Sequence, residues 1–178
     1  MRPRTGEVLH FSEDPTIRRF EPHVAPTAQF AQPYVWAVDS ARCPGYWFPR
    51  DCPRAMAWAT KTSTSADRDR ILGPGGGDRV HAIEYGWLEA MRTIKLYVYR
   101  LPAKDFYPIG TPVTTAHVST RPVAPIGPPE EVGDLLRLHE ECGIQLRVLN
   151  NLWPFWDAVV STTLGFSGIR LRNAKPRP

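Results

Sequence analysis

The chain has 178 residues, among them 19 prolines and 13 glycines, and its formal net charge is +4 at neutral pH. Each proline removes a backbone donor and breaks a helix interior, so long helical bundles and coiled coils are excluded. A hydrophobic fraction of 42% with so low a net charge argues against a disordered chain. We therefore expect a single domain over residues 1–178, built from short elements and frequent turns.

Charge and cysteine content narrow the choice of partner and compartment. No segment forms a strongly basic arm, so nucleic acid is not the favoured partner. No apolar run approaches the roughly 18 residues of a membrane span, and no signal segment opens the chain. Three cysteines, of which Cys43 and Cys52 are closest in sequence, form no metal-ligand pattern. We expect a cytoplasmic protein without a metal ion or a membrane partner.

In the amino-terminal half, the sequence pattern predicts short strands separated by turns. Strands are expected at 7–12 and 34–39. Asp51 is a candidate helix N-cap and Pro53 suits a first helical turn, so a short helix is expected at 52–60. Residues 61–79 are polar and glycine-rich and are expected to form a flexible loop.

The carboxyl-terminal half mixes strands with short helices. Strands are expected at 80–84, 94–101, 111–118, 144–149 and 167–172. Helices are expected at 87–93, from Pro129 to about Cys142, and at 154–163. The chain then ends in a basic tail at about 173–178. Because strands and helices are interspersed without a regular βα alternation, the fold class is α+β, with a mixed or antiparallel split sheet.

Two neighbouring strands carry the first candidate binding residues. His10 and Ser12 alternate onto one face of the first strand, where both can hydrogen-bond one ligand. Tyr34 and Trp36 share a face of the second strand, where they can stack on a planar ring. Without a ligand, His10 would hydrogen-bond a neighbouring carbonyl group, and the aromatic rings would pack into the core.

The segment from Arg50 to Arg54 is a candidate anion site. A helix start with free N–H groups between two arginines attracts a negatively charged group. Cys52 at the same place would be a nucleophile if its pKa were lowered, with His10 or His81 as its base.

Acidic side chains near the predicted strand ends are candidates for a catalytic acid. Asp105 follows the strand at 94–101, and Glu84 ends the strand before it. Either carboxylate can act as an acid in a cleft or simply cap a turn.

Three motifs resemble a family of uncharacterised bacterial proteins. They are LHFSEDP at 9–15, VWAVD at 35–39 and FPRDCPR at 48–54. Similarity to the same family continues through 96–100, 132–136 and 166–173, so it covers most of the chain.

More distantly, the chain resembles small ADP-ribosyltransferase-like proteins, which include rifampin-modifying transferases and tRNA 2′-phosphotransferases. The resemblance rests on LHFS at 9–12, on an aromatic second strand, and on a later strand that leads to an acid. It implies that His10 and Ser12 hold the ribose of NAD and that Tyr34 or Trp36 stacks on nicotinamide. Asp105 would orient the acceptor or stabilise the oxocarbenium ion.

We therefore expect an NAD-binding enzyme that transfers an ADP-ribosyl or phosphoryl group. Its cleft would combine His10, Ser12, an aromatic ring, Asp105 and the arginines Arg50 and Arg54. The alternative is a non-catalytic α+β protein that binds another protein or RNA through its arginine and aromatic surface. A structure that shows whether these side chains converge separates the two.

Overall fold

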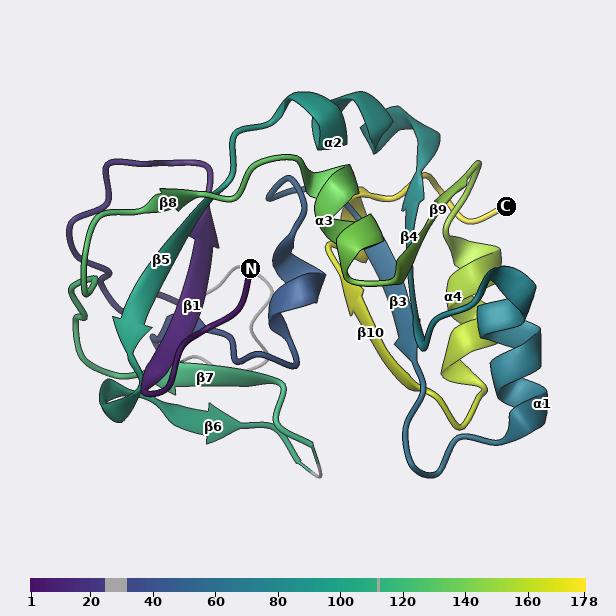
Figure 1. Ribbon diagram of the computed structural model, residues 1–178, viewed down its shortest axis with the longest axis horizontal. Helices are drawn as coiled ribbons and strands as arrows, with labels where there is room; N and C mark the ends of the chain where they lie inside the picture. Colours follow the sequence, from purple (N-terminus) through teal and green to yellow (C-terminus); the bar gives the residue numbers. More distant parts are fainter. Residues whose placement is uncertain (25–31, 112) are drawn as a thin grey trace. The chain divides into compact units, whose positions relative to one another are not determined.

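The computed structural model describes residues 1–24, 32–111 and 113–178. Short strands and short helices are interspersed along the chain without a regular alternation, which confirms the predicted α+β class (Figure 1). By their contacts the residues group into two compact units, each made of two segments. Unit 1 consists of Met1–Trp47 and Lys95–Gly133, and unit 2 consists of Phe48–Ile94 and Asp134–Pro178.

Unit 1 contains two small antiparallel sheets. The first has the order β1-β5-β8, with β1 at Glu7–Ser12, β5 at Tyr97–Pro102 and β8 at Glu130–Glu131. The second has the order β2-β7-β6, with β2 at Val35–Ala37, β7 at Ala116–Ser119 and β6 at Tyr107–Ile109. A bridge between Leu9 and Val38 joins β1 to the end of β2. The strands that carry His10 and Trp36 are therefore neighbours.

The core of unit 1 explains why β1 has its register. Val8, His10 and Ser12 pair with Leu101, Tyr99 and Tyr97, so these six side chains share one face. Val8, Tyr99 and Leu101 on that face pack in one cluster with Val35, Ala37, Phe20 and Val123. A slip of one residue would move this apolar set to the opposite face of the pair and away from its cluster, so the core fixes which way His10 points.

Unit 2 is built on a four-stranded sheet of order β10-β3-β4-β9, in which only β4 and β9 run parallel. The strands are β3 at Arg54–Trp58, β4 at Arg79–Glu84, β9 at Ile144–Leu149 and β10 at Gly165–Ile169. The helices are α1 at Ser65–Asp67, α2 at Leu88–Thr93, α3 at Leu135–Glu141 and α4 at Trp153–Val160. Among the described residues, none of the helices has the length and apolar character needed to cross a membrane.

The two faces of this sheet are covered differently. Ala57 and Val80 pack with Ile71, Leu72 and Val159, so α4 covers one face. The alternate residues Arg54, Met56 and His81 lie on the opposite face, where His81 meets His139 of α3. Helices α3 and α4 therefore lie on opposite sides of the sheet (Figure 1).

The helix predicted at 52–60 is wrong, because these residues form strand β3. The run Ala55-Met56-Ala57-Trp58 is compatible with a period of 2 as well as 3.6, and neighbouring strands on both sides select the extended form. Small alanines on one face also let α4 approach the sheet closely.

The helix expected from Pro129 begins later, at Leu135. Asp134 caps it by accepting hydrogen bonds from the backbone N–H groups of Leu136 and Arg137. The acids Glu130 and Glu131, which resemble a first helical turn in the sequence, instead pair with β5 as strand β8.

Three other segments differ from expectation. Residues 61–79 contain α1 and two further helical turns, at Arg68–Leu72 and Gly73–Gly75, rather than loop alone. Of the strand expected at 111–118, the last residues belong to β7, β6 precedes this range, and residue 112 lies outside the described residues. The basic residues at 173–178 are held on unit 2, where Trp153 Nε1 donates to the carbonyl of Lys175 at 2.8 Å.

Candidate functional site

His10 is oriented by the neighbouring strand. Its Nδ1 lies 2.7 Å from the carbonyl oxygen of Trp36, so Nδ1 carries the proton and donates it. The ring also packs against Phe20, with a centroid separation of 4.5 Å. Ser12 is buried, and its hydroxyl oxygen accepts the backbone N–H of Asp14 at 3.1 Å. The structure thus places both residues on one face, with part of their hydrogen-bonding capacity used inside unit 1.

The predicted aromatic residues form a cluster with a third ring. Tyr34 packs edge-on against Trp36 at 5.8 Å and against Tyr107 at 6.4 Å between ring centroids. A hydrogen bond with Tyr34 raises the pKa of Tyr107. The Trp36 Nε1 atom is buried and has no hydrogen-bond partner within residues 1–24, 32–111 and 113–178. Tyr34, Trp36 and Tyr107 are called the aromatic cluster below.

Asp105 lies toward the other end of β1 from Ser12. It ends the 3-10 turn Ala103–Asp105 after β5, whose last residue Pro102 pairs with Glu7, while His10 pairs with Tyr99. Three residues of strand span roughly 10 Å. The described residues offer the exposed Asp105 carboxylate no hydrogen bond or ion pair, but the pairing does not bring it beside His10.

Glu84, the alternative acid, has a structural task in unit 2. Its buried carboxylate accepts the backbone N–H groups of Leu152 at 3.1 Å and of Lys175 at 3.1 and 3.2 Å. It ties α4 and the carboxyl-terminal segment to β4.

The helix start predicted around Arg50 and Arg54 is wrong, because these residues precede and open strand β3; anion binding by the two arginines stays a prediction. Arg50 is exposed ahead of β3, whereas Arg54 is buried. The Arg54 guanidinium donates to the carbonyl of Cys52 at 2.8 Å and lies 5.0 Å from the Phe48 ring centroid. Arg50 and Arg54 belong to unit 2, and His10 and Trp36 to unit 1, so their shared cleft stays a prediction.

Cys52 does not have the properties of a nucleophile. Burial raises the pKa of its thiol to about 12, against a smaller lowering effect of Arg54. Its Sγ lies 3.6 Å from the Pro53 carbonyl oxygen. The proposed base His81 is hydrogen-bonded to His139 instead. A buried thiol that stays protonated at neutral pH lacks the lowered pKa on which the Cys52–histidine hypothesis depends.

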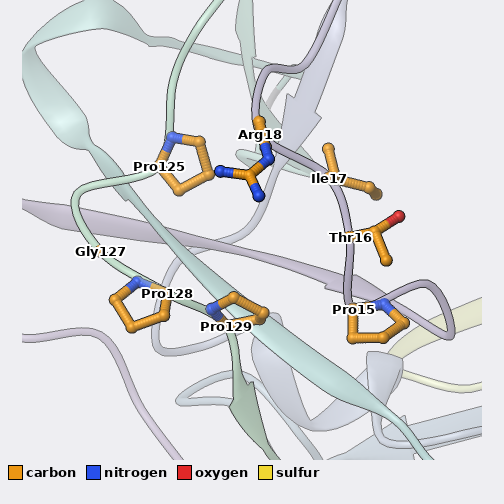
Figure 2. A pocket seen from close by; sticks show the side chains of 8 residues that line it. All are labelled: Pro15, Thr16, Ile17, Arg18, Pro125, Gly127, Pro128 and Pro129. Carbon is orange, nitrogen blue, oxygen red and sulfur yellow. The ribbon is translucent and has the colours of Figure 1, made fainter.

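A pocket of about 490 Å³ opens in unit 1 between two loops. Figure 2 shows Arg18 reaching from the first loop toward Pro125 on the second. The lining residues are Pro15, Thr16, Ile17, Arg18, Pro125, Gly127, Pro128 and Pro129. The proline rings fix the backbone φ angles, so these walls are stiff, and Arg18 supplies a positive charge.

The pocket is connected to the strand that carries His10 and Ser12. The Tyr99 hydroxyl donates to the Asp14 carbonyl at 2.6 Å and accepts the Ile17 N–H at 3.1 Å. Tyr99 is the cross-strand partner of His10. The first pocket loop is therefore fixed to the same face of the β1–β5 pair.

Sequence reasoning missed Arg18, Tyr107 and His117. Arg18 follows the Asp14-Pro15 turn, and the prolines at 125–129 give the only sequence signal for a rigid wall opposite it. His117 lies on β7 opposite Ala37, and its Nδ1 is buried without a hydrogen-bond partner in the part of the chain that the structure describes.

In the described ranges, no group of three or more histidine, cysteine, aspartate or glutamate side chains is arranged to hold a metal ion. Comparison with curated proteins and with solved structures gives no significant match. The model of one family matches residues 9–174, nearly the whole chain. The chain therefore belongs to the family of unknown function DUF6886.

Proposed function

We propose that unit 1 binds a nucleotide-type ligand, with NAD as the candidate, in a transferase of the ADP-ribosyltransferase-like type. The observation that carries the proposal is the pocket with Arg18, which is fixed through Tyr99 to the strand of His10 and Ser12. Its volume of about 490 Å³ lies in the range of small-molecule sites. Within the described residues, Arg18 has no acidic partner, so its guanidinium is available to a phosphate group.

The residues present fit parts of such a ligand. Arg18 would bind the diphosphate, and the aromatic cluster offers ring faces for a planar base or nicotinamide. His10, oriented by the Trp36 carbonyl, would hold a ribose hydroxyl. Bound NAD supplies an ADP-ribosyl group with nicotinamide as its leaving group. In this proposal Asp105, which strand pairing keeps away from His10, would serve the acceptor rather than the ribose.

Thermal unfolding in the presence of NAD tests the binding half of the proposal. A ligand that binds only the folded state at ten times its Kd stabilises the protein by about 1.4 kcal/mol. We expect NAD to raise Tm in the wild type and Arg18→Gln to abolish the shift. Arg19→Gln is the matched control, because Arg19 is adjacent but ion-paired with Glu21. No shift with the wild type, or an equal shift with Arg18→Gln, contradicts the proposal.

Release of nicotinamide tests the transferase half. The wild type should liberate nicotinamide slowly from NAD with water as acceptor, and His10→Gln should reduce the rate when both proteins are assayed well below their Tm. If NAD binds but no nicotinamide is released, the protein binds a nucleotide and the proposed transferase activity is refuted.

A non-catalytic role in RNA or protein binding is the competing explanation. Arg54 is buried, which removes it from the surface that this explanation needs. An RNA oligonucleotide that stabilises the protein where NAD does not, with a steep salt dependence, would favour it.

A further inference from the structure

Unit 2 contains a pair of buried histidines outside the proposed site. His81 Nδ1 on β4 lies 3.0 Å from His139 Nε2 on α3, and both side chains are at most 1% exposed. The rings meet edge-on at 5.1 Å, and the Phe48 ring packs against both. The pair is therefore a direct polar link between the sheet and α3.

The hydrogen bonds determine where the protons are. His139 Nδ1 lies 2.7 Å from the carbonyl oxygen of Leu135, so Nδ1 carries a proton and Nε2 is an acceptor. His81 Nδ1 must then donate to that acceptor. The lone pair of His81 is left on Nε2, a buried atom without a hydrogen-bond partner among the described residues. Two neutral rings satisfy this chain, whereas two protonated rings would oppose N–H to N–H.

The neighbouring titratable and charged groups that act on His81 all oppose a further proton. On the same face of the sheet lie Arg79 of β4 itself and Arg54 of β3, while α3 contributes His139. The residues of β9 on that face are apolar, with Leu146 opposite His81. Glu84 lies on the other face, where it accepts backbone N–H groups. Burial, followed by His139, Arg79 and Arg54, lowers the pKa of His81 well below its usual value. Burial also lowers the pKa of His139.

Helix α3 depends on this contact because it is short. It spans seven residues, of which only Leu135 and His139 are buried. A helix of this length is unstable in isolation and is maintained by its packing. Loss of the His139 contact removes one of its two buried anchors.

We propose that the His81–His139 pair is an acid-sensitive latch that holds α3 on the sheet of unit 2. With α3 docked the rings are neutral. With α3 released both rings meet solvent, so the pKa of His139 returns to an ordinary value of about 6.5 and that of His81 rises toward it, and both can take up protons. Docking is thus fully favourable above that pH. It weakens as pH falls toward the depressed pKa values of the docked state, because the released state binds more protons.

Amide hydrogen exchange followed by NMR tests the latch in the wild type. After correction for the intrinsic pH dependence, exchange in α3 should accelerate by up to about tenfold per pH unit per titrating histidine below about pH 6. Amides of α4, on the other face, are the internal control and should not change. Equal pH dependence in α3 and α4 would overturn the proposal.

Variants and ring nitrogen shifts make the test specific. The double variant His81→Leu/His139→Leu leaves no unpaired ring N–H and should lose the pH response of α3. His23→Gln, at an exposed histidine of unit 1, should keep it. Imidazole ¹⁵N shifts of the wild type at neutral pH should show both rings protonated on Nδ1. A pH response that persists in the double variant, or a different tautomer, contradicts the latch.

Discussion

The orientation of the His10 ring depends on residues of neighbouring strands. The alternation of β1 predicts that His10 and Ser12 share a face, and the pairing with Tyr99 and Tyr97 confirms it. The hydrogen bond to the Trp36 carbonyl depends on the bridge between Leu9 and Val38, a contact that no local pattern specifies. The sequence therefore predicts the face of His10 but not the atom that orients it.

The three cysteines differ in exposure, and alkylation tests the assignment of Cys52 as structural. Cys43 and Cys52 are buried and Cys142 is exposed. We expect native protein at pH 8 to react with iodoacetamide at Cys142 only, because burial keeps the Cys52 thiol protonated. Intact-mass spectrometry should then show one modification in native protein and three after denaturation. Alkylation of native Cys52 as fast as Cys142 would contradict this.

Arg100 joins two acids across β1, β5 and β8. Its guanidinium lies 2.7 Å from carboxylate oxygens of both Glu7 and Glu130, and its side chain is 13% exposed. We expect Arg100→Met to lower the free energy of unfolding by about 2–3 kcal/mol, because Glu7 loses its partner in a mostly buried place. Arg137→Met, at an exposed pair with Glu141, should cost less than about 0.5 kcal/mol. Similar losses in the two variants, measured by urea denaturation, would refute the expectation.

The same pair of acids predicts part of the acid sensitivity. Burial raises the pKa of Glu7, but hydrogen bonds from Arg4 and Arg100 outweigh it and lower the pKa overall. The hydrogen bond from Arg100 lowers the pKa of Glu130. The stabilisation is therefore present above the unfolded-state pKa of about 4.3 and is lost as pH falls through the lowered values. Arg100→Met should reduce the slope of stability against pH in this range.

At the level of elements, local pattern and tertiary contact disagree most clearly at 52–60. Asp51, Cys52 and Pro53 have the residue types of a helix start, yet strands β10 and β4 pair with the following residues on both sides. Intrinsic helix preference is weak compared with two complete ladders of hydrogen bonds and buried side chains. The same competition between helix preference and strand pairing explains why Glu130 and Glu131 form β8 beside β5 and not the first turn of a helix. Strands β1, β4 and β9, whose alternation is clear, are predicted closely.

The turn before β4 and the end of α3 provide a matched pair of glycines. Gly77 has φ +80°, and a Cβ built there would lie 2.5 Å from the carbonyl oxygen of Gly143. Gly143 has φ +62°, but its Cβ would face open space. We expect Gly143→Ala to cost about 1 kcal/mol from backbone strain alone and Gly77→Ala roughly 2–4 kcal/mol. Equal losses in denaturant unfolding would show that the close approach is absent in solution.

For the whole molecule, composition predicts one domain over 1–178, and the contacts show two compact units whose segments interleave along the chain. Nothing in the sequence marks residues 47, 94 and 133 as crossing points, because long-range pairing defines them. The residues of the candidate site, too, could be predicted from the sequence only in part. His10, Ser12, Tyr34 and Trp36 are found from alternation, whereas Arg18 becomes a candidate only when the loop at 125–129 lies opposite it.

Because each unit is built from two separate segments of the chain, a fragment of the chain should not fold. A chain of residues 1–94 contains β1 without its partner β5 and β4 without β9. We expect this fragment to show no cooperative thermal transition by circular dichroism, whereas the full chain unfolds cooperatively. A sharp transition in the fragment would mean that the segments fold independently.

We propose that the Arg18 pocket of unit 1 binds a nucleotide such as NAD. An NMR titration of ¹⁵N-labelled protein with NAD tests it most directly. We expect saturable shifts at the amides of 16–18, at Ile126 and Gly127, and along β1. In Arg18→Gln the apparent affinity read from these shifts should fall at least tenfold. Unchanged spectra at millimolar NAD, or shifts confined to unit 2, would contradict it.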